Sequence, residues 1–210
     1  MAPPTQWFAR IRRQILYGGI WSERHHNSHL DGVVELFQRS TKSRQRAIAS
    51  GIAPLLADGN LIARTGGVLL LEELGGVLGA QRIARLVEAN LHNLEGVQAD
   101  LSYRNFFGDD LASPIYRMLG NLQDPAAAPL LRDAWQRGHK VDVSLAMVDP
   151  DWVVEHPQLL HRKAIGGVLL RLPDDERRAK LLTALAPWDP EVADGKWWRK
   201  LDGDVERLKA

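Results

Sequence analysis

The residues best suited to metal chemistry lie in one short segment near the start of the chain, residues 23–29 (ERHHNSH). His25 and His29 are four positions apart, which places two imidazoles on one face of a helix, where they can bind one zinc ion together with Glu23. The segment has no HExxH pattern, however, and its Asn-Ser pair is more typical of a polar capping loop. We therefore expect no cofactor, while a metal at the cluster of His25, His26 and His29 stays open.

Three pairs of carboxylates are candidates for general acid and base chemistry. They are Asp109 with Asp110, Asp149 with Asp151, and Asp174 with Asp175. Each pair has a structural explanation, because the first and third open predicted helices, where acidic groups favour the helix dipole, and the second flanks a proline in a turn. The chain contains no cysteine, no GxSxG motif and no glycine-rich phosphate loop. These observations predict a protein that is not an enzyme.

The composition is that of an ordinary globular protein. The chain has 210 residues, of which 45% are hydrophobic and 25% charged, and a net charge of +1. This length suits a single domain. The sequence has no long apolar run, its N-terminus does not resemble a secretory signal, and cysteine is absent. We therefore expect a cytoplasmic protein without a membrane segment.

Charge is unevenly distributed along the chain. Residues 1–50 carry a balance of +5, residues 51–160 a balance of −6, and residues 161–210 a balance of +2. Nucleic-acid binding requires a concentrated basic surface, so this pattern makes a nucleic-acid partner improbable. An acidic middle suits a basic protein partner better, although charges that merely solvate helix faces would give the same pattern.

Helical periodicity runs through almost the whole sequence and predicts an all-α protein. The expected helices cover residues 6–17, 30–39, 42–57, 61–74, 79–93, 109–121, 125–137, 158–172, 174–186 and 190–208. Pro54 is expected to kink or break its helix, and residues 139–157 are expected to be irregular. The predicted single domain spans 1–210, with capping helices in 1–41 and 188–210 around helix pairs in 42–187.

One sequence pattern recurs within the chain. The segment GGVLL occurs at residues 66–70 and again at 166–170, and the helix that follows also matches in its basic and apolar positions, at an offset of 95. Glycines inside a helical pattern favour close helix packing. These pairs, and residues 109–138, resemble HEAT-type helical repeats, and the resemblance implies a short α-solenoid. An irregular helical bundle is the alternative.

Aromatic residues beside carboxylates are the candidates for partner binding. Two of the seven tryptophans, Trp135 and Trp152, lie next to acidic residues and turns, a combination that protein interfaces use. Partly buried structural tryptophans are the alternative. The predicted partner-binding residues are Tyr103, Phe106, Phe107, Asp109, Asp110, Asp133, Trp135, Asp149, Asp151, Trp152 and Glu155.

These features predict a protein-binding scaffold. By its helical composition and lack of catalytic motifs, the chain is similar to the immunity proteins that neutralise bacterial toxins, which implies steric and electrostatic occlusion of a basic toxin or enzyme. Charge reversal at Asp149 and Asp151 is then expected to weaken binding. One alternative is a DNA-binding protein similar to the HEAT-like alkylpurine DNA glycosylases, with Trp135 or Trp152 beside Asp133 or Asp151. Another is a structural subunit of a larger complex. The sequence does not indicate the oligomeric state.

Overall fold

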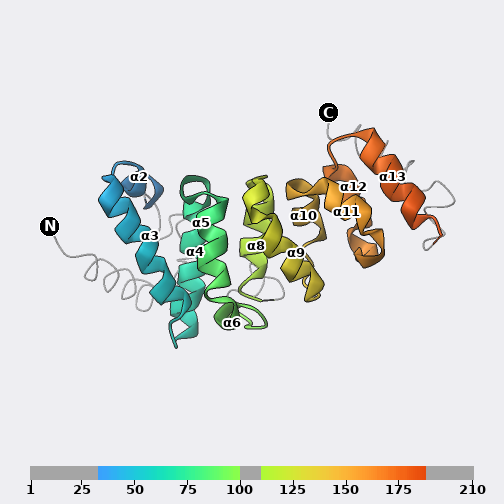
Figure 1. The fold of residues 1–210 in the computed structure, drawn as a ribbon. Coiled ribbons are helices and arrows are strands. Elements are labelled where there is room, and N and C mark those ends of the chain that lie inside the picture. The colour runs from blue at the N-terminus through green and yellow to red at the C-terminus, as the bar shows by residue number, and fades with distance from the viewer. Residues whose placement is uncertain (1–32, 100–109, 188–210) are drawn as a thin grey trace, which may run out of the picture. The chain divides into compact units, whose positions relative to one another are not determined.

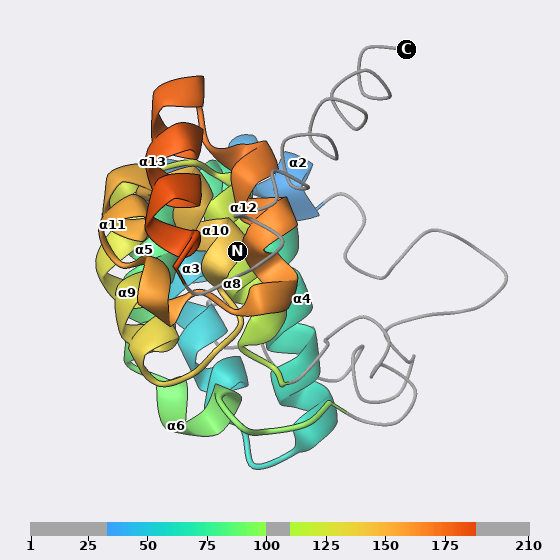
Figure 2. The ribbon, with the colours of Figure 1, turned by 90° about the vertical axis from the view of Figure 1, so that its right-hand side faces the viewer.

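A computed structural model describes residues 33–99 and 110–187. The predicted all-α class is confirmed, because these residues form helices joined by turns and contain no strand (Figures 1 and 2). The chain divides between Leu122 and Gln123 into two compact units, here called the first unit and the second unit. The sequence predicts a single domain over 1–210, without a boundary at this position.

The first unit contains six described α-helices. They are α2 (Val33–Gln38), α3 (Lys42–Leu56), α4 (Leu61–Leu78), α5 (Ala80–Glu88), α6 (Leu91–Leu94) and α8 (Ser113–Asn121). Polar side chains set where two of them begin, since Thr41 accepts a hydrogen bond from the Arg44 amide and Asn60 accepts one from the Ile62 amide at 2.9 Å. Pro54 does not end α3, which continues to Leu56. The predicted break is therefore absent.

Helix α4 is the centre of the first unit. It contacts α2, α3, α5 and α8, and its apolar side chains point into the core from most of its circumference. Those buried include Val68, Leu70, Leu71 and Leu74, each 0% exposed. A helix surrounded on several sides must be apolar nearly all round, which explains why the segment LIARTGGVLLLEELGGVL has so few charges.

The glycines of the repeated GGVLL segment lie where helices approach closely, as predicted. A Cβ atom on Gly67 would lie 3.0 Å from Leu55 Cβ and 3.3 Å from the Leu55 carbonyl carbon, across the contact of α3 with α4. In the second copy, a Cβ on Gly167 would lie 3.0 Å from Cγ2 of Val143. An added side chain would thus press against both side chain and backbone of Leu55 in the first copy, and against the Val143 side chain in the second.

Replacing Gly67 with valine should lower the free energy of unfolding by about 2 kcal/mol, because the branched side chain meets Leu55 backbone that cannot move aside. Gly76 is the matched control, since it lies in the same helix and its Cβ would meet nothing within 4 Å. Gly76→Val should change stability by less than about 0.5 kcal/mol. Urea unfolding followed by far-ultraviolet circular dichroism measures both variants, and equal losses would contradict the close approach.

The second unit contains five α-helices and three 3₁₀ helices in its described part. The α-helices are α9 (Ala128–Gln136), α10 (Asp142–Val148), α11 (Pro150–Glu155), α12 (Ile165–Arg171) and α13 (Asp175–Leu185). The 3₁₀ helices are η1 (Pro125–Ala127), η2 (Pro157–Leu159) and η3 (Arg162–Ala164). Helix α10 contacts α9, α11 and α12, while α11 contacts α13.

Residues 139–157 are not irregular, which corrects the sequence prediction. They form α10 and α11, and Asp149 begins α11 by accepting a hydrogen bond from the Trp152 amide, with Pro150 at the first helical position. The sequence pattern predicts a turn at this Asp-Pro step, but aspartate followed by proline also starts helices. The same arrangement holds at Asp124 and Pro125, where the Asp124 side chain accepts a hydrogen bond from the Ala126 amide.

The two copies of the repeated sequence are both helical but differ in length. Helix α4 has 18 residues, whereas α12 has seven and is preceded by η2 and η3 rather than by further α-helical turns. The sequence similarity thus corresponds to a shared glycine contact and not to helices of equal size. The HEAT-like solenoid stays a prediction.

Candidate protein-binding surface

Seven of the eleven predicted partner-binding residues lie in the part of the chain that the structure describes. Those outside the described residues are Tyr103, Phe106, Phe107 and Asp109. Asp110 belongs to the first unit and the other six to the second unit. These six residues of the second unit are Asp133, Trp135, Asp149, Asp151, Trp152 and Glu155.

Asp110 has a structural role in the first unit. Its carboxylate is 3% exposed and accepts hydrogen bonds from the Gly96 amide at 2.8 Å, the Ala112 amide at 3.1 Å and the Ser113 amide at 2.9 Å. A buried carboxylate whose oxygens are occupied by backbone amides is not presented to a partner. Its assignment to partner binding is therefore corrected, and the helix that was predicted to begin at residue 109 begins at Ser113, three residues after Asp110.

Trp152 is the centre of an aromatic cluster on α11. Its ring meets that of Trp135 edge to face with a centroid separation of 4.7 Å, and it stacks on His156 at 4.3 Å. The guanidinium carbon of Arg132 lies 5.5 Å from the centre of the Trp152 ring, within reach of a cation–π interaction. The His156 Nδ1 donates a hydrogen bond to the Trp152 carbonyl at 2.8 Å. Trp152 is partly exposed, and its contacts with Trp135, His156 and Arg132 hold the ring in place.

Trp135 supports this cluster from the core of the second unit. It is 4% exposed, so a partner cannot contact its ring directly, and its predicted role as a contact residue is corrected. Its indole Nε1 is buried and makes no hydrogen bond with a described residue. The sequence suggested an interface because Trp135 follows the exposed Asp133 closely, but helix α9 turns these two side chains in different directions.

Asp149 is already engaged within the protein. Its carboxylate accepts a hydrogen bond from Nε of Arg132 at 2.6 Å and forms an ion pair with Nη2 of the same residue. Its other oxygen caps α11 through the Trp152 amide. Charge reversal at Asp149 would therefore disturb the fold as well as any interface, and it is a poor test of partner binding.

Arg177 of α13 neutralises two carboxylates. It forms hydrogen bonds to both oxygens of Asp151, at 2.7 and 3.0 Å, and an ion pair with Asp174, which also caps α13. The hydrogen bond from Arg177 holds the pKa of Asp151 below its usual value. The backbone amide and side chain of Arg177 do the same for the pKa of Asp174. Both carboxylates accordingly stay charged in more acidic solution than a free aspartate does.

Helices α11 and α13 enclose a shallow groove of about 190 Å³. We call it the α11–α13 groove, and it is lined by Asp151, Val154, Glu155, Glu176, Arg177 and Lys180. Lys180 pairs with Glu176 at 2.8 Å. Glu155 is exposed and forms no ion pair with any residue that the structure describes. A basic group of a partner can therefore pair with the Glu155 carboxylate without displacing an existing ion pair.

Comparison with known proteins adds no relative. No family model, curated protein or solved structure matches the chain.

The described residues offer no grouped metal ligands, because no three histidine, aspartate or glutamate side chains in 33–99 and 110–187 are placed to share one ion. The cluster of His25, His26 and His29 lies outside these ranges. No helix in the same ranges has the length and apolar character needed to cross a membrane.

Sequence reasoning missed Arg177, His156 and the groove itself. The Arg177 side chain meets Asp151 across 26 positions of sequence, and no local pattern indicates such a contact. The nearest available signal was the spacing of Trp152 and His156, four residues apart and so on one face of a helix. It went unused because the segment was expected to be irregular.

Proposed function

We propose that the protein is a non-catalytic protein-binding module that covers a basic toxin or enzyme, in the manner of toxin-neutralising immunity proteins. The observation that carries the proposal is the surface of α11, where the partly exposed Trp152 lies between the exposed carboxylates Asp151 and Glu155. Aromatic anchors with adjacent charge dominate the binding energy of many protein interfaces.

The rigidity of Trp152 supports this role. Its contacts with Trp135, His156 and Arg132 hold the ring in one orientation before any partner arrives. Side chains that are ordered beforehand lose less conformational entropy on binding, so a braced tryptophan contributes more affinity than a mobile one.

The charge distribution favours a basic partner. The carboxylate of Asp151 is paired with Arg177, but that of Glu155 forms no ion pair with a described residue, so the groove has one negative charge available. A lysine or arginine of the partner would pair with Glu155 at the groove while apolar groups cover Trp152. Steric coverage of the partner's working surface would then inhibit it.

The test is affinity capture with the tagged protein from nuclease-treated lysate of its source cells, quantified by mass spectrometry, using Glu155→Lys and a matched Glu88→Lys variant. Glu88 is an exposed glutamate of α5 in the first unit, with no ion pair to a described residue. Glu155→Lys should reduce recovery of a stoichiometric partner protein about tenfold or more, because the substituted side chain then repels the basic group of the partner. Glu88→Lys should leave recovery of that partner unchanged.

The alternatives give different results. In a parallel capture without nuclease, recovery of nucleic acid that is lost when nuclease is added would favour the DNA-binding alternative, and retention on heparin would support it. A captured protein that is harmless when expressed alone would indicate a structural subunit instead of an inhibitor. A protein retained equally by both glutamate variants would contradict docking at the α11–α13 groove, and failure to capture any protein would contradict the proposal as a whole.

A further inference from the structure

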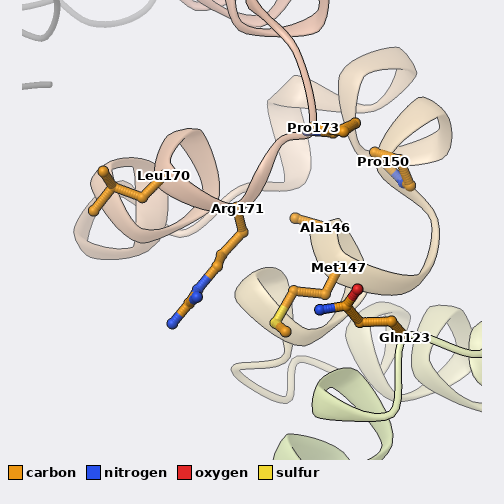
Figure 3. A pocket seen from close by; sticks show the side chains of 7 residues that line it. All are labelled: Gln123, Ala146, Met147, Pro150, Leu170, Arg171 and Pro173. Atoms are coloured by element: carbon orange, nitrogen blue, oxygen red, sulfur yellow. The ribbon is translucent and has the colours of Figure 1, made fainter. Parts of the chain in front are cut away.

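A second concave site lies in the second unit, apart from the α11–α13 groove. It is a pocket of about 310 Å³, called here the Arg171 pocket, and its lining residues are Gln123, Ala146, Met147, Pro150, Leu170, Arg171 and Pro173 (Figure 3). This volume is at the lower end of the range for ligand sites, so it suits a group of one or two residues in size.

The lining of the Arg171 pocket combines one cation and one amide with several apolar side chains. Of the described residues that line it, Arg171 alone is charged. Its guanidinium is exposed and forms no ion pair or hydrogen bond with a described residue. Met147, Pro150, Leu170 and Pro173 supply apolar atoms to the lining, and Leu170 is 36% exposed. An unpaired guanidinium beside apolar surface favours an anionic ligand with an apolar body.

Gln123 adds a polar group at the same pocket. Its backbone has φ +52°, in the left-handed region, which glycine adopts more easily than any residue with a side chain. In Figure 3 the Gln123 amide lies beside Met147, on the side of the pocket away from Arg171. This residue directly follows Leu122, the C-cap of α8, where a left-handed residue commonly ends a helix, so the end of α8 places the Gln123 side chain at the pocket.

We propose that the Arg171 pocket binds the C-terminal residue of a peptide, with its free carboxylate on Arg171 and an aliphatic side chain against Met147. A C-terminal residue carries the carboxylate and the side chain on the same Cα, so both fit one small pocket, whereas the carboxylate of an internal aspartate brings no apolar group. The guanidinium can hold both carboxylate oxygens at once, and the Gln123 amide can bond the peptide backbone. Met147 adapts to the side chain because it is unbranched and flexible.

The test uses protein labelled with ¹³C at the methionine methyl groups and two small probes, N-acetyl-L-leucine and its neutral counterpart N-acetyl-L-leucine amide. The chain has three methionines, of which Met147 lines the pocket and Met118 packs beside Gly75 in the first unit, where it serves as an internal control. The acid should shift the Met147 methyl signal in a saturable manner and leave that of Met118 in place. The amide should bind about fivefold or more weakly, because it lacks the charge that pairs with Arg171.

Two variants separate binding from folding. Arg171→Gln should remove the preference for the acid over the amide while keeping the Met118 signal and the melting temperature close to those of the unchanged protein. Lys163→Gln removes an exposed cation of η3 that does not line the pocket, and it should keep the preference. Equal binding of acid and amide, a preference that survives Arg171→Gln, or no saturable shift of Met147 would each overturn the proposal. None of these results depends on capture of a partner at the α11–α13 groove.

Discussion

Replacing Asp110 with alanine should lower the free energy of unfolding of the first unit by about 3 kcal/mol. The change removes the acceptor of three backbone amides, those of Gly96, Ala112 and Ser113, and of the Ser113 hydroxyl. Because the site is 3% exposed, water cannot replace these hydrogen bonds without opening the structure. Hydrogen exchange should accelerate most at the segment around Gly96 and at the start of α8.

The geometry of Asp110 provides a graded control. Oδ1 accepts from Ala112 and Ser113, and Oδ2 accepts from Gly96, so asparagine can keep the first set and lose only the second. Asp110→Asn should therefore cost about half as much as the alanine variant. Asp133→Ala removes an exposed aspartate and should change stability by less than about 0.5 kcal/mol. If Asp110→Ala were as mild as Asp133→Ala, the structural role assigned to Asp110 would be wrong.

Replacing Asp142 with alanine should destabilise the second unit by about 2–3 kcal/mol. The Asp142 carboxylate is 1% exposed, and it accepts hydrogen bonds from the His161 backbone amide at 2.9 Å and from His161 Nδ1 at 2.8 Å. It thereby joins the start of α10 to the segment between η2 and η3. Chemical denaturation gives the loss of stability, and hydrogen exchange at His161 and η3 shows where the structure opens.

A comparison with His161→Ala separates the stability contributed by each of the two hydrogen bonds that Asp142 accepts. This variant keeps the backbone amide of residue 161 and removes only the ring, so its cost should be about 1 kcal/mol and smaller than that of Asp142→Ala. A larger loss for His161→Ala than for Asp142→Ala would mean that the imidazole packing, and not the buried carboxylate, holds this connection together.

The carboxylates of the second unit show why charge in the sequence is an incomplete guide to a binding surface. The sequence marks Asp149, Asp151 and Glu155 as equivalent acidic candidates beside Trp152. The structure pairs Asp149 with Arg132 and Asp151 with Arg177, and it leaves Glu155 without an ion pair to a described residue. Only the last can offer its full charge to a partner, because an existing ion pair must be given up before a new one forms.

Local interactions in the sequence determined much of the helical structure. Apolar periodicity predicted the all-α class, Asp174 predicted the start of α13, and the repeated glycines predicted close helix packing. These signals are reliable because a cap or a period is encoded by residues within a few positions of one another.

The tertiary structure alone decided the rest. Helices α10 and α11 have seven and six residues, fewer than two full turns, which is too short for a helical period to be distinguished from an irregular segment. Whether Trp135 faces the core, and which arginine meets Asp149 or Asp151, depends on contacts between residues 17 to 26 positions apart. The sequence alone therefore determined which segments become helices, whereas packing between them decided which side chains are buried, which charges are paired, and which remain available for binding.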